Sequence, residues 1–194
     1  MAETAKKIAT YSDIEALPKN VVGEIVYGSL VTHPRPAPPH ARAQFSLSYE
    51  LEGPFNRGKG GPGGWIFFTE PELHLGANVI VPDLAGWKSE RLPNAAAKAW
   101  IETSPDWVCE IISPSTERVD RAEKRQIYLE FGVPFLWLLD PRAKLLECFT
   151  LRTKQWVLSH TFELNQNVSA PPFEAASFDL SKIFLSDWPE STSE

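Results

Sequence analysis

Apolar stretches with the length of buried β-strands recur in the second half of this chain. The clearest span residues 79–87, 107–112 and 135–139, and apolar runs of this length are typical of strands in a covered sheet. Residues 116–131 separate the last two and repeat their apolar positions with a helical period. The pattern therefore predicts strands that are joined through a helix packed on the sheet.

Shorter sequence patterns predict the elements of the N-terminal half. Residues 10–18 predict a short helix capped by Thr10 or Ser12, which we expect only to pack against the rest of the domain. Residues 24–31 predict a hairpin around a glycine turn. The glycine-rich stretch 58–64 predicts a loop.

A longer helix follows a proline-rich link. The prolines at 34–39 exclude a helix or a central strand there, and a helix that covers the sheet is predicted at about 40–52. One face of this helix carries Ala41, Phe45, Ser48 and Tyr49. Further along, residues 95–101 predict a short helix, and residues 145–151 and 155–162 predict a closing hairpin.

Length and composition predict a single domain. The chain has 194 residues, of which 43% are hydrophobic and 23% are charged, and a chain of this kind can bury one sizeable core. We place the domain at residues 10–186, with an N-terminal tail at 1–9 and a C-terminal tail at 187–194.

The same composition disfavours several classes of protein. No apolar run approaches the roughly 20 residues of a membrane helix, so we expect no membrane association. The polar N-terminus carries no secretory signal, which makes the protein cytoplasmic by expectation. Cys109 and Cys148 lack the spacing of a disulfide framework or a zinc site, and we expect both in the core.

The net charge of −6 argues against a protein that coats nucleic acid by bulk electrostatics. A nuclease would need a local basic surface instead. One candidate cluster contains Arg118, Arg121, Lys124 and Arg125. A looser one contains Arg35, Arg42, Arg57 and Lys59. Both are interspersed with acids or prolines, so charge alone does not indicate DNA as a partner.

Two isolated carboxylates are the strongest chemical signal. Asp83 lies in the apolar stretch 79–87 and Glu110 in the stretch 107–112, and every neighbour within two positions is uncharged. A carboxylate on a buried strand costs several kcal/mol unless something charged meets it. Two of them from two strands therefore suggest a site that holds a cation.

The predicted helix 116–131 brings an ammonium to the same region. Its inward stripe carries Asp120, Lys124, Ile127, Tyr128 and Phe131. A lysine on an inward face needs a carboxylate, so it is expected to converge with the two strand acids. A divalent cation on such acids would polarise a phosphate and lower the pKa of a bound water, and the ammonium could orient that water or neutralise developing charge. This chemistry is phosphodiester hydrolysis.

The motifs around these residues resemble those of a known family. They are Pro82-Asp83, the string Glu110-Ile111-Ile112-Ser113-Pro114-Ser115-Thr116, then Asp120-Arg121, Lys124, Tyr128, Gly132-Val133-Pro134, Trp137 and Asp140-Pro141, and upstream Glu24-Ile25-Val26-Tyr27-Gly28 and His40. Together they resemble the Uma-type endonucleases, a branch of the restriction-endonuclease-like PD-(D/E)XK superfamily. The resemblance covers most of residues 10–185.

The resemblance implies an α/β fold, with a single domain whose mixed central β-sheet is flanked by helices, as in restriction endonucleases. It implies one divalent ion, Mg²⁺ or Mn²⁺, bound by Asp83, Glu110 and the backbone carbonyl of Ile111. Glu24 and Lys124 would complete the catalytic residues. The candidate substrate contacts are His40, Arg121 and Tyr128.

The lysine departs from the simplest superfamily pattern, which places it two residues after the glutamate. Ile112 occupies that place here, so Lys124 would have to supply the ammonium from the following helix. Lys124 also has a structural interpretation, as an ion pair with Glu110 or Asp120. These two interpretations stay open in the sequence.

Other candidates have simpler interpretations as well. Asp83 could cap a turn after Pro82, and Glu24 could be a supporting acid or a surface residue of the hairpin. His40 is interpreted as a helix-start residue rather than a base. Asp140 is interpreted as a turn residue at the end of a strand.

The sequence thus favours a metal-dependent DNA endonuclease. We expect a homodimer, because cutting duplex DNA needs two active sites or two sets of phosphate contacts. The first alternative is a nucleic-acid-binding or scaffold module without activity, which DNA binding without cleavage would favour. The second is a metal-dependent phosphoesterase for a small substrate, which a pocket too narrow for a duplex, together with the acidic surface, would favour.

Overall fold

The structure is a computed structural model that describes residues 8–33, 35–92 and 98–185. Most of the two tails expected from the sequence lies outside these ranges. The helix expected at 95–101 also begins outside them. Its described end is not helical, because Ile101 forms an isolated β-bridge with Leu73.

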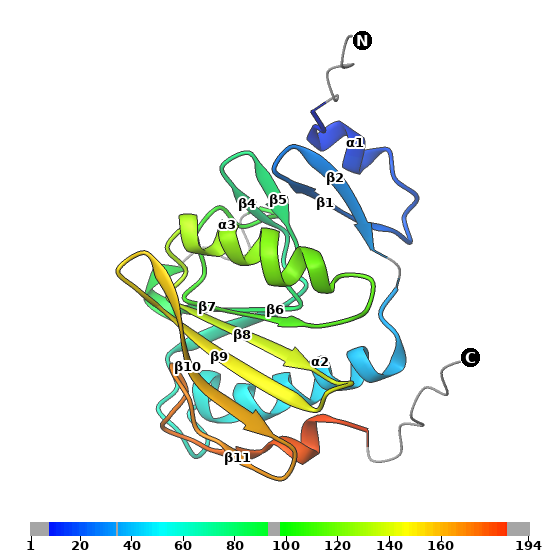
Figure 1. Ribbon diagram of the computed structural model, residues 1–194. Helices are drawn as coiled ribbons and strands as arrows, with labels where there is room; N and C mark the ends of the chain where they lie inside the picture. Colours follow the sequence, from blue (N-terminus) through cyan, green and yellow to red (C-terminus); the bar gives the residue numbers. More distant parts are fainter. Residues whose placement is uncertain (1–7, 34, 93–97, 186–194) are drawn as a thin grey trace, which may run out of the picture.

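A six-stranded sheet forms the centre of the fold (Figure 1). Its strands are β3 (Trp65–Thr69), β6 (Leu84–Lys88), β7 (Trp107–Ile111), β8 (Phe135–Asp140), β9 (Leu145–Arg152) and β10 (Gln155–Glu163). They run in the order β10, β9, β8, β7, β6, β3. Only β7 and β8 are parallel neighbours in this sheet, so the sheet is mixed, as predicted.

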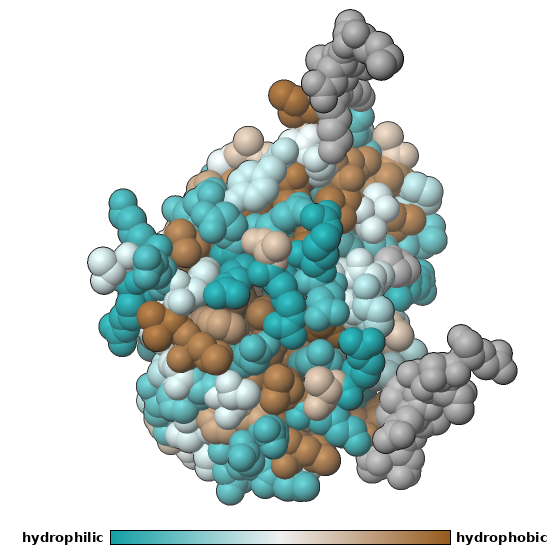
Figure 2. All heavy atoms as spheres, in the orientation of Figure 1, coloured by the Kyte–Doolittle hydropathy of each residue, from teal (hydrophilic) through white to brown (hydrophobic). Residues whose placement is uncertain are grey.

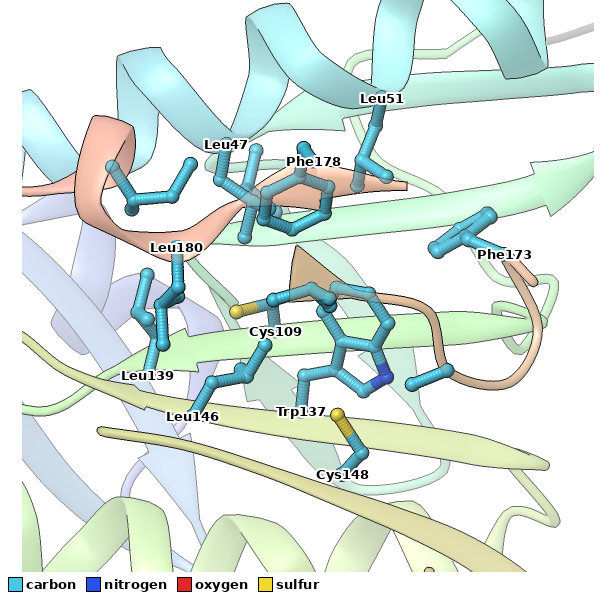
Figure 3. Close-up of a cluster of buried hydrophobic side chains, with 14 of the residues drawn as sticks. Leu47, Leu51, Cys109, Trp137, Leu139, Leu146, Cys148, Phe173, Phe178 and Leu180 are labelled. Carbon is cyan, nitrogen blue, oxygen red and sulfur yellow. The ribbon is translucent and has the colours of Figure 1, made fainter. Parts of the chain in front are cut away.

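Alternation along β7 separates the two faces of the sheet. Trp107, Cys109 and Ile111 belong to one hydrophobic core, and Val108 belongs to the other. Because successive side chains of a strand point to opposite faces, Glu110 points to the side of Val108. Both cysteines lie in the first core (Figure 3), where they are buried and unbridged, as expected.

Helix α2 (Pro38–Leu51) covers the first core and continues into a π-helical turn, η1 (Glu52–Asn56). The helix begins inside the link expected at 34–39, because proline is tolerated in the first helical turn. Its buried face carries Ala43, Ser46, Leu47 and Leu51. Figure 3 shows the two leucines pointing from α2 towards the sheet.

The face of α2 that the sequence suggested is not the one that packs. Phe45 and Tyr49 are 66% and 73% exposed, and the leucines two positions further along are buried. Two positions correspond to a rotation of about 200° around a helix. Both stripes have helical spacing, so periodicity could not tell which one faces the sheet.

A smaller, four-stranded sheet runs in the order β2, β1, β5, β4. Its strands are β1 (Val22–Val26), β2 (Ser29–His33), β4 (Leu73–Leu75) and β5 (Asn78–Ile80). The antiparallel pair of β1 and β2 is the hairpin predicted at 24–31. The predicted short helix is α1 (Tyr11–Glu15), where the amide of Thr10 donates to Asp13 Oδ2 at 2.8 Å.

The chain crosses from the small sheet to the central sheet around Pro82. The single strand predicted at 79–87 is therefore wrong, because β5 ends before Val81 and β6 begins directly after Asp83. Pro82 has no N–H to offer a sheet, and the amide of Val81 donates to Glu24 Oε1 at 2.5 Å. Asp83 thus lies at a crossover between two sheets and not inside one strand.

The second face of the central sheet is covered by a helical segment on the opposite side from α2 (Figure 1). It consists of a π-helical part, η3 (Val119–Lys124), and helix α3 (Arg125–Glu130), which confirms the helix predicted at 116–131. Four residues of its predicted inward stripe, Asp120, Lys124, Ile127 and Tyr128, are buried. The fifth, Phe131, is partly buried against the second core. The face over α3 is largely hydrophilic (Figure 2).

The remaining elements close the fold. The predicted closing hairpin is formed by β9 and β10. The short elements are η2 (Ser89–Arg91), β11 (Asn167–Val168), β12 (Phe178–Asp179) and η4 (Leu180–Ile183). None of the helices in the described ranges has the length and hydrophobicity that a membrane span requires.

The orientation of α2 can be tested with two substitutions on neighbouring turns. Leu47→Ala removes a fully buried side chain and should lower the free energy of unfolding by about 2–5 kcal/mol. Phe45→Ala removes an exposed one and should change it by less than about 0.5 kcal/mol. Urea denaturation measures both. Equal losses in the two variants would contradict the orientation.

Candidate functional site

Four segments from both sheets and from the helical layer meet around one pocket. The pocket has a volume of about 280 Å³ and is lined by Asp83, Glu110, Asp120 and Lys124, among others. One wall is formed between the end of β2 and the first turn of α2, by His33, Arg35, Pro36, Ala37 and His40. Residues 113–116, which follow β7, contribute to another. Asp83, Glu110 and Lys124 are therefore brought together, as the sequence suggested.

The ammonium of Lys124 lies at the centre of the charged groups. Its Nζ is 2.9 Å from Glu110 Oε1, 3.2 Å from Glu24 Oε1 and 3.6 Å from Asp120 Oδ1, and it donates to the carbonyl of Val81 at 3.2 Å. Burial by itself would lower the pKa of Lys124. The carboxylates of Glu110 and Glu24 outweigh burial and raise this pKa well above its ordinary value, so Lys124 is a permanent cation.

The local helix geometry helps to deliver this ammonium. Lys124 is the last residue of η3, and π-helical segments inside helices are frequent at functional sites. The segment places Asp120 and Lys124 on the same inward face, where both are buried. The next turn, in α3, adds Tyr128, whose hydroxyl donates to Glu110 Oε1.

Glu110 is a carboxylate in an apolar place. Burial raises its pKa well above the ordinary value, the ammonium of Lys124 opposes this, and the nearby acids Asp120 and Asp83 add to the rise. The pKa of Asp120 is raised as well, first by burial. Additional positive charge would therefore stabilise the ionised forms of these carboxyls.

Glu24 has the opposite character although it is equally buried. Burial tends to raise its pKa, but the ammonium of Lys124, a hydrogen bond with His33 and one from the Val81 amide lower it to about 2. Glu24 Oε2 contacts His33 Nε2, and Glu24 Oε1 receives the Val81 amide. Glu24 is thus a stable anion that holds both the crossover and the lysine.

Asp83 is fixed from three sides. Its Oδ2 accepts the amide of Ile111 at 2.7 Å, and its Oδ1 lies 3.0 Å from His40 Nε2. The carbonyl of Asp83 accepts from the Gln44 side chain at 2.9 Å and from the Glu70 amide at 3.1 Å. These contacts join the crossover to β7 and to α2, so the carboxylate has a defined position at the pocket.

His40 lies in the first turn of helix α2 and contacts the Asp83 carboxylate from there. Burial tends to lower the pKa of His40, but the hydrogen bond and the charge of Asp83 outweigh it, and the pKa is raised. Its Nδ1 is buried and has no hydrogen-bond partner among the described residues. His40 lines the pocket, so this nitrogen is a polar group without a protein partner beside the carboxylates.

Three other residues expected at the site lie elsewhere or contribute differently. Arg121 pairs with Glu147 at 2.7 Å and Glu117 at 3.1 Å, and it is not among the residues that line the pocket. Tyr128 is fully buried behind Glu110. The amide of Ile111 donates to Asp83 Oδ2, and the role of its carbonyl as a metal ligand stays a prediction.

The sequence did not predict two residues that contact the site, His33 and Gln44. In the hairpin of β1 and β2, His33 pairs with Val22, two residues from Glu24 on the same strand face, so the hairpin register could have revealed it. Gln44 lies one helical turn after His40, so the two share a helix face. The sequence did not show that this face is the one next to Asp83. Asp140 accepts two backbone amides of the following turn at 2.9 Å, which agrees with its interpretation as a turn residue.

The oxygen-rich donor set fits a hard divalent cation in chemistry. Asp83 and Glu110 both line the pocket. The described residues contain no group of three or more His, Cys, Asp and Glu side chains that is arranged to hold a metal ion. Because Mg²⁺ takes six oxygen ligands, Asp83 and Glu110 would leave the other positions to the backbone, water or substrate.

Comparisons with known proteins bear on the family and the fold. Residues 9–181 match a family described as "Uma2: Putative restriction endonuclease". A crystal structure of a "putative nuclease belonging to DUF820" from Anabaena variabilis has a similar fold, with a TM-score of 0.73 at 20% sequence identity. The similarity covers 91% of this chain and 97% of that one. No curated protein gives a significant match.

The anionic character of Glu24 predicts a pH-dependent contribution to stability. A depressed folded-state pKa stabilises the protein above the unfolded value, near 4.5, and this stabilisation is lost as the pH falls through about 2. The shift corresponds to roughly 3 kcal/mol. The difference in unfolding free energy between the parent and Glu24→Gln should shrink by about that amount between pH 5 and pH 2. Urea titrations at several pH values measure it, and a difference that does not change with pH would contradict the assignment.

Proposed function

Because this chain belongs to the Uma2 family of restriction endonucleases, a family described as putative, we propose that it is a metal-dependent nuclease that hydrolyses phosphodiester bonds of DNA. The observation that carries the proposal is the convergence of Asp83, Glu110 and Lys124 on one pocket. Two acids of this kind can hold a divalent ion, and a lysine beside them can stabilise the charge that develops in phosphodiester hydrolysis.

Asp83 and Glu110 would hold the ion, together with the carbonyl of Ile111. Oxygen-only ligands favour Mg²⁺ or Mn²⁺ over zinc. When bound, such an ion polarises the phosphate and lowers the pKa of a coordinated water. The excess of carboxylates around Lys124 supports this role, because added positive charge would offset the cost of ionising Glu110 in a buried place.

Lys124 would act on the substrate from a fixed position. Its ammonium is held by Glu110 and Glu24 and cannot swing away, so it meets an incoming phosphate already oriented. A preorganised positive charge stabilises charge that develops in the transition state without reorganisation at the moment of reaction. Glu24 supports it by holding the lysine and the Val81 peptide at the same time.

His40 is the polar group that we propose to face the substrate. It holds Asp83 with one ring nitrogen, and the other has no partner in the described part of the chain. When the ring is protonated, that nitrogen can donate a hydrogen bond to a phosphate oxygen or a water, and the neutral ring can accept one there from a water. Arg121 is left outside the proposed site, because Glu117 and Glu147 already neutralise it, and Tyr128 acts by orienting Glu110.

The size of the pocket favours one alternative. A volume of about 280 Å³ is at the small end for small-molecule sites, which range from roughly 300 to 1,000 Å³. A phosphoesterase for a small substrate is therefore the second candidate. Hydrolysis of a chromogenic phosphodiester with no cleavage of DNA would favour it. A nucleic-acid-binding module without activity is the third candidate.

We also propose that the protein is a homodimer in the cytoplasm. Sedimentation velocity tests the dimer.

Metal binding is the first test. Isothermal calorimetry with Mn²⁺ should give one site in the parent and a large loss of affinity in Asp83→Asn and Glu110→Gln, because each removes a charged ligand. Glu72→Gln is the matched control, since Glu72 is a half-buried acid that bonds with Tyr11 and His74 away from the pocket. The ligand assignment is wrong if both pocket variants bind Mn²⁺ as the parent does.

The role of Lys124 is the second test. Lys124→Ala should lower the rate of DNA cleavage at least about a hundredfold, the scale for losing one transition-state donor, and should leave Mn²⁺ binding in place. It should also lower the melting temperature, because three buried carboxylates lose their cation. Rate and melting temperature are measured on the same sample. Full activity with lower stability would leave Lys124 a structural ion pair only.

A further inference from the structure

An exposed groove lies directly beside the pocket, on the outer side of α2. It has a volume of about 840 Å³ and is lined by Phe45 and Tyr49 of the helix and by Phe67, Phe68 and Leu84 of the sheet. Phe45 and Tyr49 are the most exposed aromatic side chains among the described residues. An exposed apolar surface of this kind marks a place where something binds.

The groove and the pocket are lined by residues that are neighbours in the chain. Leu84 and Phe45 line the groove, whereas the adjacent Asp83 lines the pocket. Gln44 bridges the two, because its amide donates to the carbonyl of Asp83 at 2.9 Å and to Glu70 Oε1 at 3.3 Å. Between His40 and Tyr49, α2 advances about 13 Å. One ligand could therefore occupy both.

Positive charge follows the same path. Arg35, Arg42, Arg57 and Lys59 are exposed before, along and after α2. Only Arg57 of these four is in an ion pair among the described residues, with Glu52 at 3.0 Å. The other basic cluster is already engaged, since Arg118 pairs with Glu123, Arg121 with two acids, and Arg125 stacks over Phe149.

The reactive groups are reachable only by a flexible backbone. The side chains of Glu110 and Lys124 are 1% and 4% exposed and lie within a pocket of about 280 Å³. The phosphates of a duplex lie on a stiff cylinder, so they would meet the rim of such a pocket. An unpaired strand can bend its backbone into the pocket and turn its bases outward.

We propose that the substrate is an unpaired nucleic-acid strand, whose scissile phosphate enters the pocket while neighbouring bases stack on Phe45 and Tyr49. Exposed aromatic rings beside basic side chains are the usual means of binding single strands. The inference rests on the proposed function for the hydrolytic step, and it adds the strand state of the substrate and the surface that selects it.

A second copy of the chain is the rival occupant of the groove. The position of the groove next to the pocket favours nucleic acid, because a substrate whose phosphate enters the pocket passes Arg35 at the pocket and Lys59 in the groove, and neither is in an ion pair among the described residues. Glu50 and Glu52 are the acids that line the groove, and Arg57 contacts one of them.

Binding without added divalent ions tests the inference independently of cleavage. Fluorescence anisotropy should show a short labelled DNA strand binding at least about tenfold more tightly than the duplex of the same sequence. Phe45→Ala/Tyr49→Ala should weaken binding of the strand about tenfold or more, the scale for losing a stacked base. The matched control is Val157→Ala/Leu158→Ala, which removes two half-exposed apolar side chains from β10, at the opposite edge of the sheet, and should change neither affinity.

Equal or tighter binding of the duplex, or unchanged strand binding by the aromatic double variant, would overturn the inference. A dimeric parent and a monomeric double variant with unchanged DNA binding would assign the groove to a second copy instead. The proposed function fails separately. If the parent binds the strand through Phe45 and Tyr49 but cleaves nothing with Mg²⁺ or Mn²⁺, the activity is wrong and the binding surface stands. If duplex is cleaved as fast as the strand and the double variant cleaves normally, the activity stands and this inference is wrong.

Discussion

The ammonium of Lys124 is the interaction on which the site depends. It contacts carboxylates from β1, β7 and its own helical segment, and a backbone carbonyl from the crossover. Each of these groups would be costly to bury alone. The lysine thus connects the small sheet, the central sheet and the helical layer, and it also lines the pocket.

Glu24, Glu110 and Asp120 share this cation unequally, and the inequality gives them different roles. Glu24 has additional donors in His33 and the Val81 amide, and its pKa is lowered to about 2. Burial raises the pKa of Glu110, the ammonium of Lys124 opposes this rise, and the neighbouring acids add to it. Glu24 is therefore suited to hold the lysine, whereas Glu110 gains most from a further cation. Asp83, which the Ile111 amide and His40 orient, stands beside it.

Helix α2 connects the chemistry to the surface. Its first turn brings His40 to Asp83, its second brings Gln44 to the Asp83 carbonyl, and its outer face exposes Phe45 and Tyr49. The leucines of the opposite face anchor the helix on the central sheet (Figure 3). Because the helix is fixed by its buried face, the exposed face keeps a constant position relative to the pocket.

The sequence by itself determined the elements with strong local signals and the identity of the main charged residues. The hairpin that carries Glu24, strand β7 with Glu110, and the inward stripe with Lys124 follow from periodicity and from the rarity of unpaired charge among apolar neighbours. The tertiary structure decided what these signals leave degenerate. In α2 the leucine stripe is buried and the aromatic stripe is exposed, which the sequence could not predict because both stripes have helical spacing. The tertiary structure divided the stretch 79–87 between two sheets, because the partner of the Val81 amide is a side chain distant in sequence. It also brought Arg121 into an ion pair with Glu147 and His33 into contact with Glu24, because pairing between charges depends on distances that only the packed chain fixes.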